Sequence, residues 1–393
     1  MPANTATSAQ CAPDKPWGLY VHIPYCRSKC IYCDFYSVAC ARLPLNAEPL
    51  LTRFAEELKA RLREVQSDCQ APRPATVYIG GGTPSLLTAD QLLRLTDGID
   101  LSGVREFTVE INPDDAASFA QTLHRMPPDR SPDRISMGVQ SLVDAELRAV
   151  GRRHTAAQAL EAISRLRDAG IGNISCDLIY GLPGQTLASF EHSLETLLQT
   201  GIEHLSSYIL SYEPSTPLTR LRDKGRITEA PEALILDMYQ SLCQATKAAG
   251  FSHYEISSFA REGRESVHNS SYWHGTPYLG LGPAAHSLGA DGVRRFNAPD
   301  VNAYLAGKDI LTAEETTPTS AINDLIITAL RTSQGLHPSA AEALSPTLAP
   351  ILARRLADLL AAGQLALTPA GAYRIPEPLW PVADAILLNL ILD

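Results

Sequence analysis

Three of the chain's eight cysteines, Cys26, Cys30 and Cys33, lie within eight residues and are spaced Cys-x3-Cys-x2-Cys. Thiolates are soft ligands, and soft ligands select iron–sulfur clusters or zinc. A structural zinc site needs four ligands, so this trio could form one only with a remote fourth ligand. Three thiolates can instead hold three irons of a [4Fe–4S] cluster and leave the fourth iron open to an exchangeable ligand. The ligand count therefore favours a [4Fe–4S] cluster.

The open iron and the residues near it suggest a small zwitterionic ligand. An open iron can chelate an amino acid through its amine and its carboxylate, and S-adenosylmethionine offers that pair. An electron from the reduced cluster could then cleave the sulfonium to a carbon radical. Polar or glycine-rich residues follow several predicted strands, namely Gly81 and Gly82 within Gly80–Pro84, then Glu110, Gln140, Arg152 and Asp177. Each is ordinary alone, but together at one sheet edge they form a pocket for a zwitterion and a ribose.

Apolar segments alternate with helical segments along the first half of the chain. We predict six strands, at residues 17–23, 76–79, 104–111, 134–139, 174–180 and 204–210. Parallel neighbours need crossover connections, so strands that alternate with helices indicate a parallel sheet with its site beyond the strands' carboxyl ends. A closed eight-fold barrel would need two more units. We therefore expect an α/β fold built on a partial (βα)6 barrel.

Helical spacing and capping patterns support the intervening helices. Leu51, Phe54 and Leu58 follow a three-and-four spacing that predicts an amphipathic helix over residues 50–66. Thr88 and Gln91 form a capping-box pattern at the start of another helix. Each of these helices would supply a crossover between two parallel strands.

Composition divides the chain into four parts. We expect a flexible arm at residues 1–15, the barrel with its cysteine loop at 16–260, a connecting segment at 261–315 and a small domain at 316–393. In the last part, leucine- and alanine-rich stretches predict helices near residues 320–332 and 347–362. A short hairpin is expected to follow them, at residues 364–367 and 373–375. This order favours a mainly helical, winged-helix-like domain.

The bulk composition excludes several classes of protein. A formal net charge of −10 argues against a general nucleic-acid binder, including DNA binding by the C-terminal domain. No apolar run reaches transmembrane length, and the first residues lack the basic start and apolar core of a signal peptide. The other cysteines follow no disulfide framework: Cys11, Cys40, Cys69, Cys176 and Cys243. A reducing cytoplasm fits both these thiols and the cluster loop.

Two histidines of the 261–315 segment, His268 and His286, are candidate ligands. His268 lies in a turn-rich run beside Tyr272 and Trp273. An imidazole with aromatic neighbours suits an axial haem ligand in a flat apolar slot. The common alternative, for His268 and for His286, is a surface histidine or a satisfied core histidine.

The motifs together resemble the radical S-adenosylmethionine superfamily. Within it they are similar to the oxygen-independent coproporphyrinogen III oxidase-like group, and most of all to the HemW-type haem chaperones. The resemblance runs from about Trp17 into the C-terminal domain and rests on YVHIPYC, GGGTPS, EINP, SMGVQS, DLIYGLPGQT, HNSSYW and GLGPAAHS. It implies a [4Fe–4S] cluster on the three loop cysteines. It also implies S-adenosylmethionine contacts from Tyr20, Tyr32, Gly81, Gly82, Thr83, Glu110, Gln140, Arg152 and Asp177.

Two features separate the branches of the group. The oxidases have a further cysteine two residues after the triad, where this chain has Phe35. The chaperones carry a histidine-asparagine-x-x-tyrosine-tryptophan run, matched here by residues 268–273. The resemblance thus implies that His268 contacts haem. It also implies a cytoplasmic haem chaperone that delivers haem to respiratory acceptors, some of them membrane-associated, and it leaves a homodimer open.

Two other functions remain open on the sequence. The intact triad and cofactor motifs also suit radical oxidation of the two propionates of coproporphyrinogen III to vinyl groups. A DNA-binding sensor rests only on the winged-helix-like tail, and the acidic balance disfavours it.

Overall fold

A curved sheet of twelve strands organises the protein. The computed structural model describes residues 15–40 and 45–392, so the predicted arm lies outside the described residues apart from Lys15. Seven parallel strands form the middle of the sheet, in the order β11 (Tyr278–Leu281), β1 (Gly18–Ile23), β4 (Thr76–Gly81), β5 (Glu106–Ile111), β6 (Arg134–Gln140), β7 (Asn173–Tyr180) and β8 (His204–Ile209).

Antiparallel strands extend the sheet at both ends. Beyond β11 lie β12 (His286–Leu288), β13 (Arg294–Asn297) and β14 (Leu311–Ala313). Beyond β8 lie β10 (Ser258–Ala260) and β9 (Ser252–Glu255). The six predicted parallel strands are confirmed, and β11 adds a seventh. The connecting segment expected at 261–315 therefore supplies part of the sheet, through strands of three or four residues that are too short to show a strand pattern.

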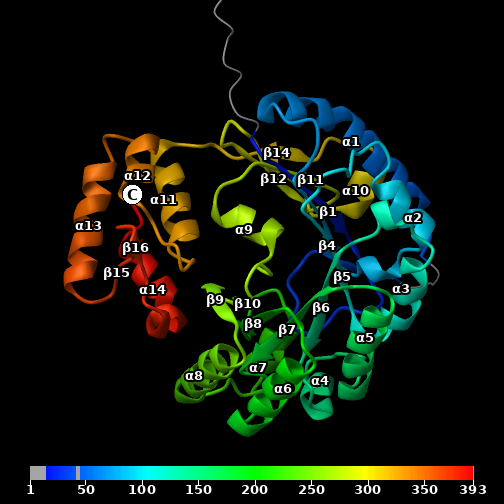
Figure 1. The fold of residues 1–393 in the computed structure, drawn as a ribbon, viewed down its shortest axis with the longest axis horizontal. Helices are drawn as coiled ribbons and strands as arrows, with labels where there is room; N and C mark the ends of the chain where they lie inside the picture. The colour runs from blue at the N-terminus through cyan, green and yellow to red at the C-terminus, as the bar shows by residue number, and fades with distance from the viewer. Residues whose placement is uncertain (1–14, 41–44, 393) are drawn as a thin grey trace, which may run out of the picture.

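Helices cover the convex face of the sheet and give it the α/β architecture expected from the sequence (Figure 1). The helices of this part of the chain are α1 (Glu48–Cys69), α2 (Ala89–Leu95), α3 (Ala116–Leu123), α4 (Asp144–Ala149), α5 (Ala156–Asp168), α6 (Leu187–Gln199), α7 (Pro217–Asp223), α8 (Glu232–Ala248) and α10 (Val301–Leu305). Helix α9 (Val267–Trp273) is the exception and lies on the other face. Short 3-10 turns follow or precede three strands, at η1 (Pro84–Leu86), η2 (Pro113–Asp115) and η3 (Pro128–Arg130). The predicted capping box at Thr88 and Gln91 is present at the start of α2.

Alternation along the strands separates an apolar face from a polar one. In β1, Leu19, Val21 and Ile23 are buried in the core under the helices. The residues between them, Tyr20 and His22, point to the opposite face, where the Tyr20 hydroxyl hydrogen-bonds His22 Nδ1 at 3.0 Å. The concave face is therefore lined by polar groups, as a barrel interior that holds a site requires.

Helix α9 lies within the concave face (Figure 1), and this corrects the turn-rich conformation expected around His268. Its amino-terminal end meets the buried carboxylate of Glu106, at the start of β5. That carboxylate accepts the Val267 N–H at 2.7 Å, the His268 N–H at 3.0 Å and the Ser266 hydroxyl at 3.3 Å. A carboxylate at this position satisfies unpaired N–H groups and complements the helix dipole. The helix is thus anchored by a residue about 160 positions earlier in the chain.

The C-terminal part forms a group of helices and a hairpin beside the sheet. Its elements are α11 (Pro318–Ala329), α12 (Pro338–Leu344), α13 (Ala349–Ala361), β15 (Ala366–Leu367), β16 (Tyr373–Arg374), η4 (Glu377–Val382) and α14 (Ala383–Leu388). The two predicted helices and the hairpin are confirmed, whereas α12 was not predicted.

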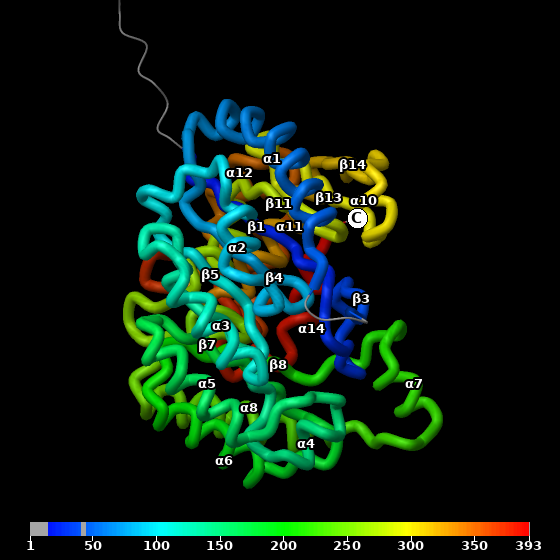
Figure 2. Tube along the Cα trace, turned by 90° about the vertical axis from the view of Figure 1, so that its right-hand side faces the viewer, coloured from blue at the N-terminus to red at the C-terminus, as the bar shows by residue number. Residues whose placement is uncertain are grey.

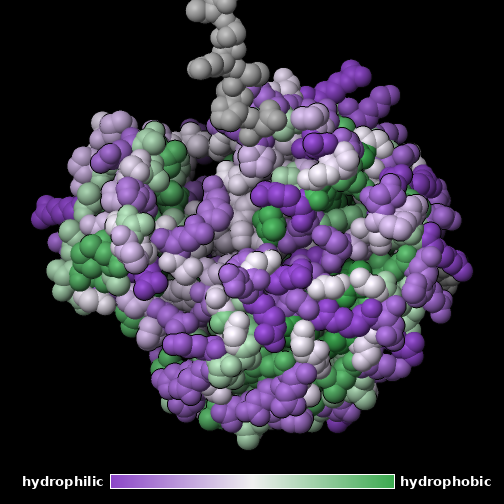
Figure 3. Space-filling view, viewed as in Figure 1, coloured by the Kyte–Doolittle hydropathy of each residue, from purple (hydrophilic) through white to green (hydrophobic). Residues whose placement is uncertain are grey.

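On the face drawn in Figure 3, apolar side chains lie scattered between hydrophilic ones. Among the described residues, no helix combines the length and apolar character needed to cross a lipid bilayer.

We expect Glu106→Gln to lower the free energy of unfolding by about 3–5 kcal/mol, measured by urea denaturation. The substitution weakens the cap of α9 and removes the buried charge facing Arg134, whose Nε lies 3.9 Å from the carboxylate. The matched control is Glu161→Gln, which breaks an exposed pair with Arg165 on α5 and should cost less than about 1 kcal/mol. Equal losses in the two variants would contradict the anchoring role of Glu106.

Candidate cluster and cofactor site

The cysteine loop leaves the carboxyl end of β1 and closes on itself. Strand β2 (Tyr25–Cys26) pairs in parallel with β3 (Val38–Ala39). The Cys40 N–H then donates to the Cys26 carbonyl at 2.7 Å. The segment that carries all three loop cysteines is therefore tied at both of its ends.

The middle of the loop rests on the carboxyl end of the barrel. The Ile31 N–H donates to the Val150 carbonyl at 3.3 Å, and the Leu218 N–H of α7 donates to the Ile31 carbonyl at 2.9 Å. Figure 2 shows β3 and α7 on the same side of the molecule. Ile31 and Tyr32 pack against an apolar cluster separate from the main core, made of Val150, Ile179, Leu182, Leu210 and Leu218. The loop thus has its own apolar support.

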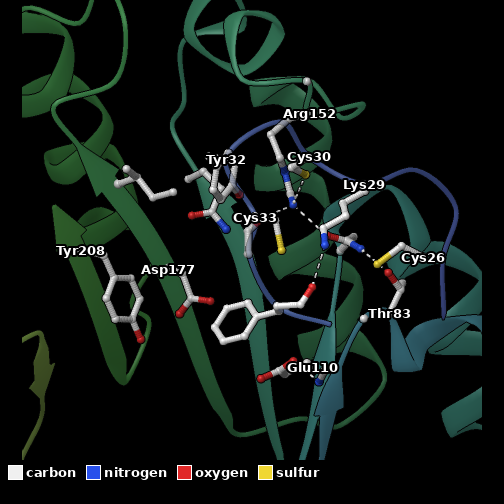
Figure 4. Close-up of a pocket in the computed structure, with 18 of the residues that line it drawn as sticks. Cys26, Lys29, Cys30, Tyr32, Cys33, Thr83, Glu110, Arg152, Asp177 and Tyr208 are labelled. Atoms are coloured by element: carbon white, nitrogen blue, oxygen red, sulfur yellow. Dashed lines mark hydrogen bonds between the residues drawn. The ribbon is translucent and has the colours of Figure 1, made fainter. Parts of the chain in front are cut away.

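Most of the residues predicted to form the site line one cavity of about 460 Å³. They are Cys26, Cys30, Cys33, Tyr32, Gly81, Gly82, Thr83, Glu110, Gln140, Arg152 and Asp177. In Figure 4 the cysteines and Arg152 lie on one side of this cavity and Asp177 and Tyr208 on the other. Tyr20 and His268 do not line it. Tyr20 packs 6.1 Å, between ring centroids, from Tyr78, which does.

The glycine turn after β4 is required by close backbone packing. The Gly82 N–H donates to the Ile23 carbonyl at 2.7 Å, and a Cβ on Gly82 would lie 2.5 Å from the Tyr25 carbonyl oxygen. Gly81 has a φ of +104°, and a Cβ there would lie 2.7 Å from the ring of His22. Only glycine lets this turn approach the start of the cysteine loop so closely.

Two carboxylates form an acidic end of the cavity. Glu110 accepts the Tyr78 hydroxyl at 2.7 Å and the Gly81 N–H at 3.0 Å. Burial raises the pKa of Glu110, although both hydrogen bonds oppose the rise. Burial, and then the charge of Glu110, raises the pKa of Asp177 to about 7. A ligand amino group or ribose hydroxyl would relieve this cost by pairing with the carboxylates.

Arg152 forms the basic end of the cavity. Its guanidinium donates to the Asn112 Oδ1 at 2.8 Å, to the Gly138 carbonyl and to Cys30 Sγ at 3.6 Å. Asn112 in turn donates to the Thr83 hydroxyl at 3.2 Å. One cation therefore joins the cysteine loop to the ends of β4, β5 and β6. Opposite charges at the two ends suit a zwitterion.

Gln140 sits in a strained backbone at the end of β6. Its φ is +69°, and the pairing of β6 with β7 shifts register between Gly138 and Gln140. A non-glycine residue in the left-handed region costs roughly 1–2 kcal/mol. Such strain is typical of functional sites, and Gln140 in this strained conformation lines the cavity.

Several lining residues escaped the sequence reasoning. Asn112 had a signal, because it ends a predicted strand next to a proline, but it was not assigned to the site. Asn269 reaches the cavity from α9, and nothing local in the sequence places α9 inside the barrel. Three large side chains at the rim are 43–68% exposed: Phe35, Tyr208 and Ile209. They give the cavity mouth an apolar edge.

The arrangement of the loop cysteines fits a cluster better than a single ion. In the part of the chain that the structure describes, three donors lie within 4.8 Å of one another only at Cys243, His253 and Glu377. The three loop thiols are therefore not all within 4.8 Å of one another, and one zinc ion with bonds of about 2.3 Å would need the loop to close around it. A polynuclear iron–sulfur group accommodates that spread.

A second cavity of about 580 Å³ lies along another side of α9. Five residues of α9 and its carboxyl end line it, namely Val267, Ser270, Ser271, Trp273 and His274. His268 itself is fully buried between the helix and the strands. Its Nδ1 hydrogen-bonds the Thr76 hydroxyl and its Nε2 the Tyr272 hydroxyl, each at 2.8 Å, and its ring stacks on Tyr78. Burial lowers the pKa of His268 to about 3, so the ring is neutral.

Comparisons with known proteins identify the family and agree with the fold. The family model of the radical SAM superfamily matches residues 20–197. The chain is 37% identical to the protein named heme chaperone HemW of Lactococcus lactis, over 74% of each chain. It is 36% identical to heme chaperone HemW of Bacillus subtilis, over 73% of this chain and 74% of the relative. The solved structure of coproporphyrinogen III oxidase (HemN) from Escherichia coli superposes with a TM-score of 0.78 at 22% identity, covering 97% of this chain and 91% of that one.

We expect Gly82→Ala to lower the iron and sulfide bound per chain after anaerobic reconstitution and to destabilise the protein by about 1–3 kcal/mol, because its Cβ would collide with the backbone of residue 25. Gly172→Ala is the matched control, since a Cβ there meets open space and the backbone is not left-handed. The control should keep its cluster and change stability by less than about 0.5 kcal/mol. Full cluster content in Gly82→Ala would show that the turn tolerates a side chain.

Asp177 should contribute a loss of stability to the ligand-free protein as the pH rises from about 4 to 7. Asp177 has a folded-state pKa of about 7, above its ordinary value, so the folded state keeps a proton that the unfolded state has already released. One such proton contributes a slope of up to about 1.4 kcal/mol per pH unit. Asp177→Asn should flatten the slope in urea denaturation, whereas Asp168→Asn, exposed at the end of α5, should keep it. Identical slopes in the wild type and Asp177→Asn would contradict this assignment.

Proposed function

The chain belongs to the HemW heme-chaperone family within the radical SAM superfamily, and from that premise we propose that it binds haem and passes it to haem-accepting respiratory proteins. The observation that carries the proposal is the extent of the likeness to relatives named heme chaperone, about three quarters of each chain. Residue 35 supports it, because an apolar, exposed Phe35 stands where the oxidases of the group have a fourth cysteine.

We propose that Cys26, Cys30 and Cys33 hold a [4Fe–4S] cluster and that the 460 Å³ cavity holds S-adenosylmethionine. When bound, this pair supplies one-electron chemistry that can generate a carbon radical. Glu110 and Asp177 would receive the amino group or the ribose hydroxyls, and Arg152 would face the carboxylate. Tyr32 would back the ligand from the cysteine loop, and Gly81, Gly82 and Thr83 would let it approach the backbone. Tyr20 does not line the cavity and would support the ligand only through Tyr78, which does line it.

We propose that haem binds against α9. The 580 Å³ cavity beside this helix offers Trp273 as an aromatic wall and Arg105 as a cation for a propionate. His268 is the proposed haem contact, although both of its ring nitrogens are hydrogen-bonded. Ligation through Nε2 would require the Tyr272 hydroxyl to move away. His274, exposed and bonded to Gln334 at 3.1 Å, lines this cavity, which His268 does not, and is the natural comparison.

Oxidation of coproporphyrinogen III is the second candidate function. It is favoured by the three loop cysteines and by the proposed cofactor cavity that they line. The likeness of fold to the Escherichia coli oxidase does not decide between the two functions, since a fold hosts many activities. Absence of a fourth cysteine at position 35 makes the oxidase the weaker proposal. A cytoplasmic location and acceptors at the membrane remain part of the chaperone proposal.

Haem titration of the reconstituted protein, followed by absorbance, tests the proposal. We expect one haem per chain in the wild type and at least about a tenfold loss of affinity in His268→Ala, a change of about 1.4 kcal/mol. His274→Ala is the control and should bind as the wild type does. Wild-type affinity in His268→Ala with a loss in His274→Ala would overturn the ligand assignment and keep haem binding. Anaerobic incubation of the same preparation with coproporphyrinogen III, S-adenosylmethionine and a reductant should yield no protoporphyrinogen; clear product formation would favour the oxidase.

A further inference from the structure

Three metal-ligating side chains converge far from the cluster loop, where the barrel meets the C-terminal elements. Cys243 comes from α8, His253 from β9 and Glu377 from η4. Their ligand atoms all lie within 4.8 Å of one another. His253 Nδ1 is 2.8 Å from Glu377 Oε1 and 4.0 Å from Cys243 Sγ. Figure 1 shows α8, β9 and the C-terminal α14 beside one another in this region.

We propose that Cys243, His253 and Glu377 bind one zinc ion, which ties the C-terminal segment to the edge of the barrel. Thiolate, imidazole and carboxylate are together a donor set typical of zinc, whereas magnesium and calcium prefer oxygen donors alone. Zinc bonds of about 2.3 Å to sulfur and 2.0 Å to nitrogen span the present gap between Cys243 and His253 after a small closing movement. This proposal is independent of the haem-chaperone function.

The geometry is that of an ion site and not of a catalytic relay. In a thiol–imidazole–carboxylate relay the thiol and the carboxylate take opposite ring nitrogens. Here both approach the same atom, His253 Nδ1, while Nε2 is buried without a hydrogen-bond partner among the described residues. The three ligand atoms lie close enough together to converge on one ion, which would replace the hydrogen bond between His253 and Glu377.

The imidazole is held in place by aromatic rings. His253 stacks on Phe259 with centroids 3.9 Å apart and meets the edge of Trp380 at 4.1 Å. Trp380 belongs to η4, so the ring that orients the histidine and the carboxylate that faces it come from the same C-terminal element. Such preorganisation lowers the cost of ordering the ligands when the ion binds.

The protonation states and the exposure of the ligands suit an ion that enters from solvent. Burial lowers the pKa of His253, so the ring is the neutral form that ligates. Burial raises the pKa of Cys243 to about 11, so binding would release one proton from this thiol to solvent. Glu377 is half exposed, which leaves the fourth position of a tetrahedral site to water. Lys247 and Arg374 also face Glu377, so the thiolate must supply much of the affinity.

The α8 and η4 elements already touch at this place without an ion. The Tyr239 hydroxyl donates to the Glu377 backbone carbonyl at 2.7 Å. A bound zinc would add a second link between the same elements, and it would act at the side chain of Glu377. We therefore expect zinc to stabilise the contact between η4 and the barrel.

Equilibrium dialysis of the cluster-loaded full chain against buffered zinc, with zinc then measured by mass spectrometry, tests the proposal. Loading the cluster first occupies the thiols of the cysteine loop. We expect one zinc per wild-type chain, its loss in Cys243→Ala and at least about a tenfold weaker affinity in Glu377→Gln. Cys69→Ala is the matched control, because Cys69 is buried at the end of α1, away from the three ligands, and it should bind zinc as the wild type does.

Thermal denaturation gives the second readout. Zinc should raise the melting temperature of the wild type and of Cys69→Ala, and not that of Cys243→Ala. Glu377→Gln keeps the experiment decisive if Cys243→Ala fails to fold, because its side chain is exposed. No zinc on the wild type, or equal zinc affinity in the wild type, Cys243→Ala and Glu377→Gln, would overturn the proposal.

Discussion

One buried carboxylate, Glu106, determines what fills the inside of this barrel. It stands at the start of β5 and binds three donors at the amino-terminal end of α9. Without that anchor a helix of seven residues has too few hydrogen bonds of its own to be stable in isolation. Because α9 is held there, His268 stacks on Tyr78, and the Tyr78 hydroxyl in turn donates to Glu110 at the cofactor cavity. The anchor and the cavity are thus connected through one ring stack and one hydrogen bond.

Two buried histidines in the interior of the barrel, His204 and His268, are hydrogen-bonded to neighbouring side chains. His204 hydrogen-bonds Ser175 at 2.7 Å and Tyr254 at 2.8 Å, in the same way that His268 uses both of its nitrogens. Burial lowers the pKa of both rings, which keeps them neutral and able to donate at one nitrogen and accept at the other. Side chains that are hydrogen-bonded on both sides, as these two histidines are, hold their neighbours in place. The cofactor cavity lies at the carboxyl ends of the strands, beyond this hydrogen-bonded layer.

Much of the fold could be predicted from local patterns. Alternating strands and helices indicated the parallel sheet, and polar residues at strand ends indicated the cavity, because both depend on residues close in sequence. The pairing of β11 with β1 could not be predicted in this way, since it joins residues about 260 positions apart through a short strand with a central glycine. The position of α9 was missed for the same reason. Its cap is a side chain on β5 and not a neighbour in the chain.

The candidate site, like the fold, could be predicted from the sequence only in part. The three loop cysteines and the residues at the ends of β4 to β7 line one cavity, as their places in the sequence suggested. Tyr20 was assigned to the cofactor site by resemblance alone, and its hydroxyl is hydrogen-bonded to His22. The strain at Gln140 and the convergence of Cys243 with Glu377, 134 positions later, are properties of three-dimensional packing. No spacing rule on the sequence could have found them.

Helix α9 borders both cavities, with Asn269 in one and Trp273 in the other. A short rigid element shared by two binding sites makes their occupants thermodynamically reciprocal. If a ligand in the first cavity favours one position of the helix, it changes the affinity of the second cavity, and the second ligand changes the first affinity by the same factor. A cofactor that is held without being consumed could in this way act as an effector of what binds on the far side of the helix.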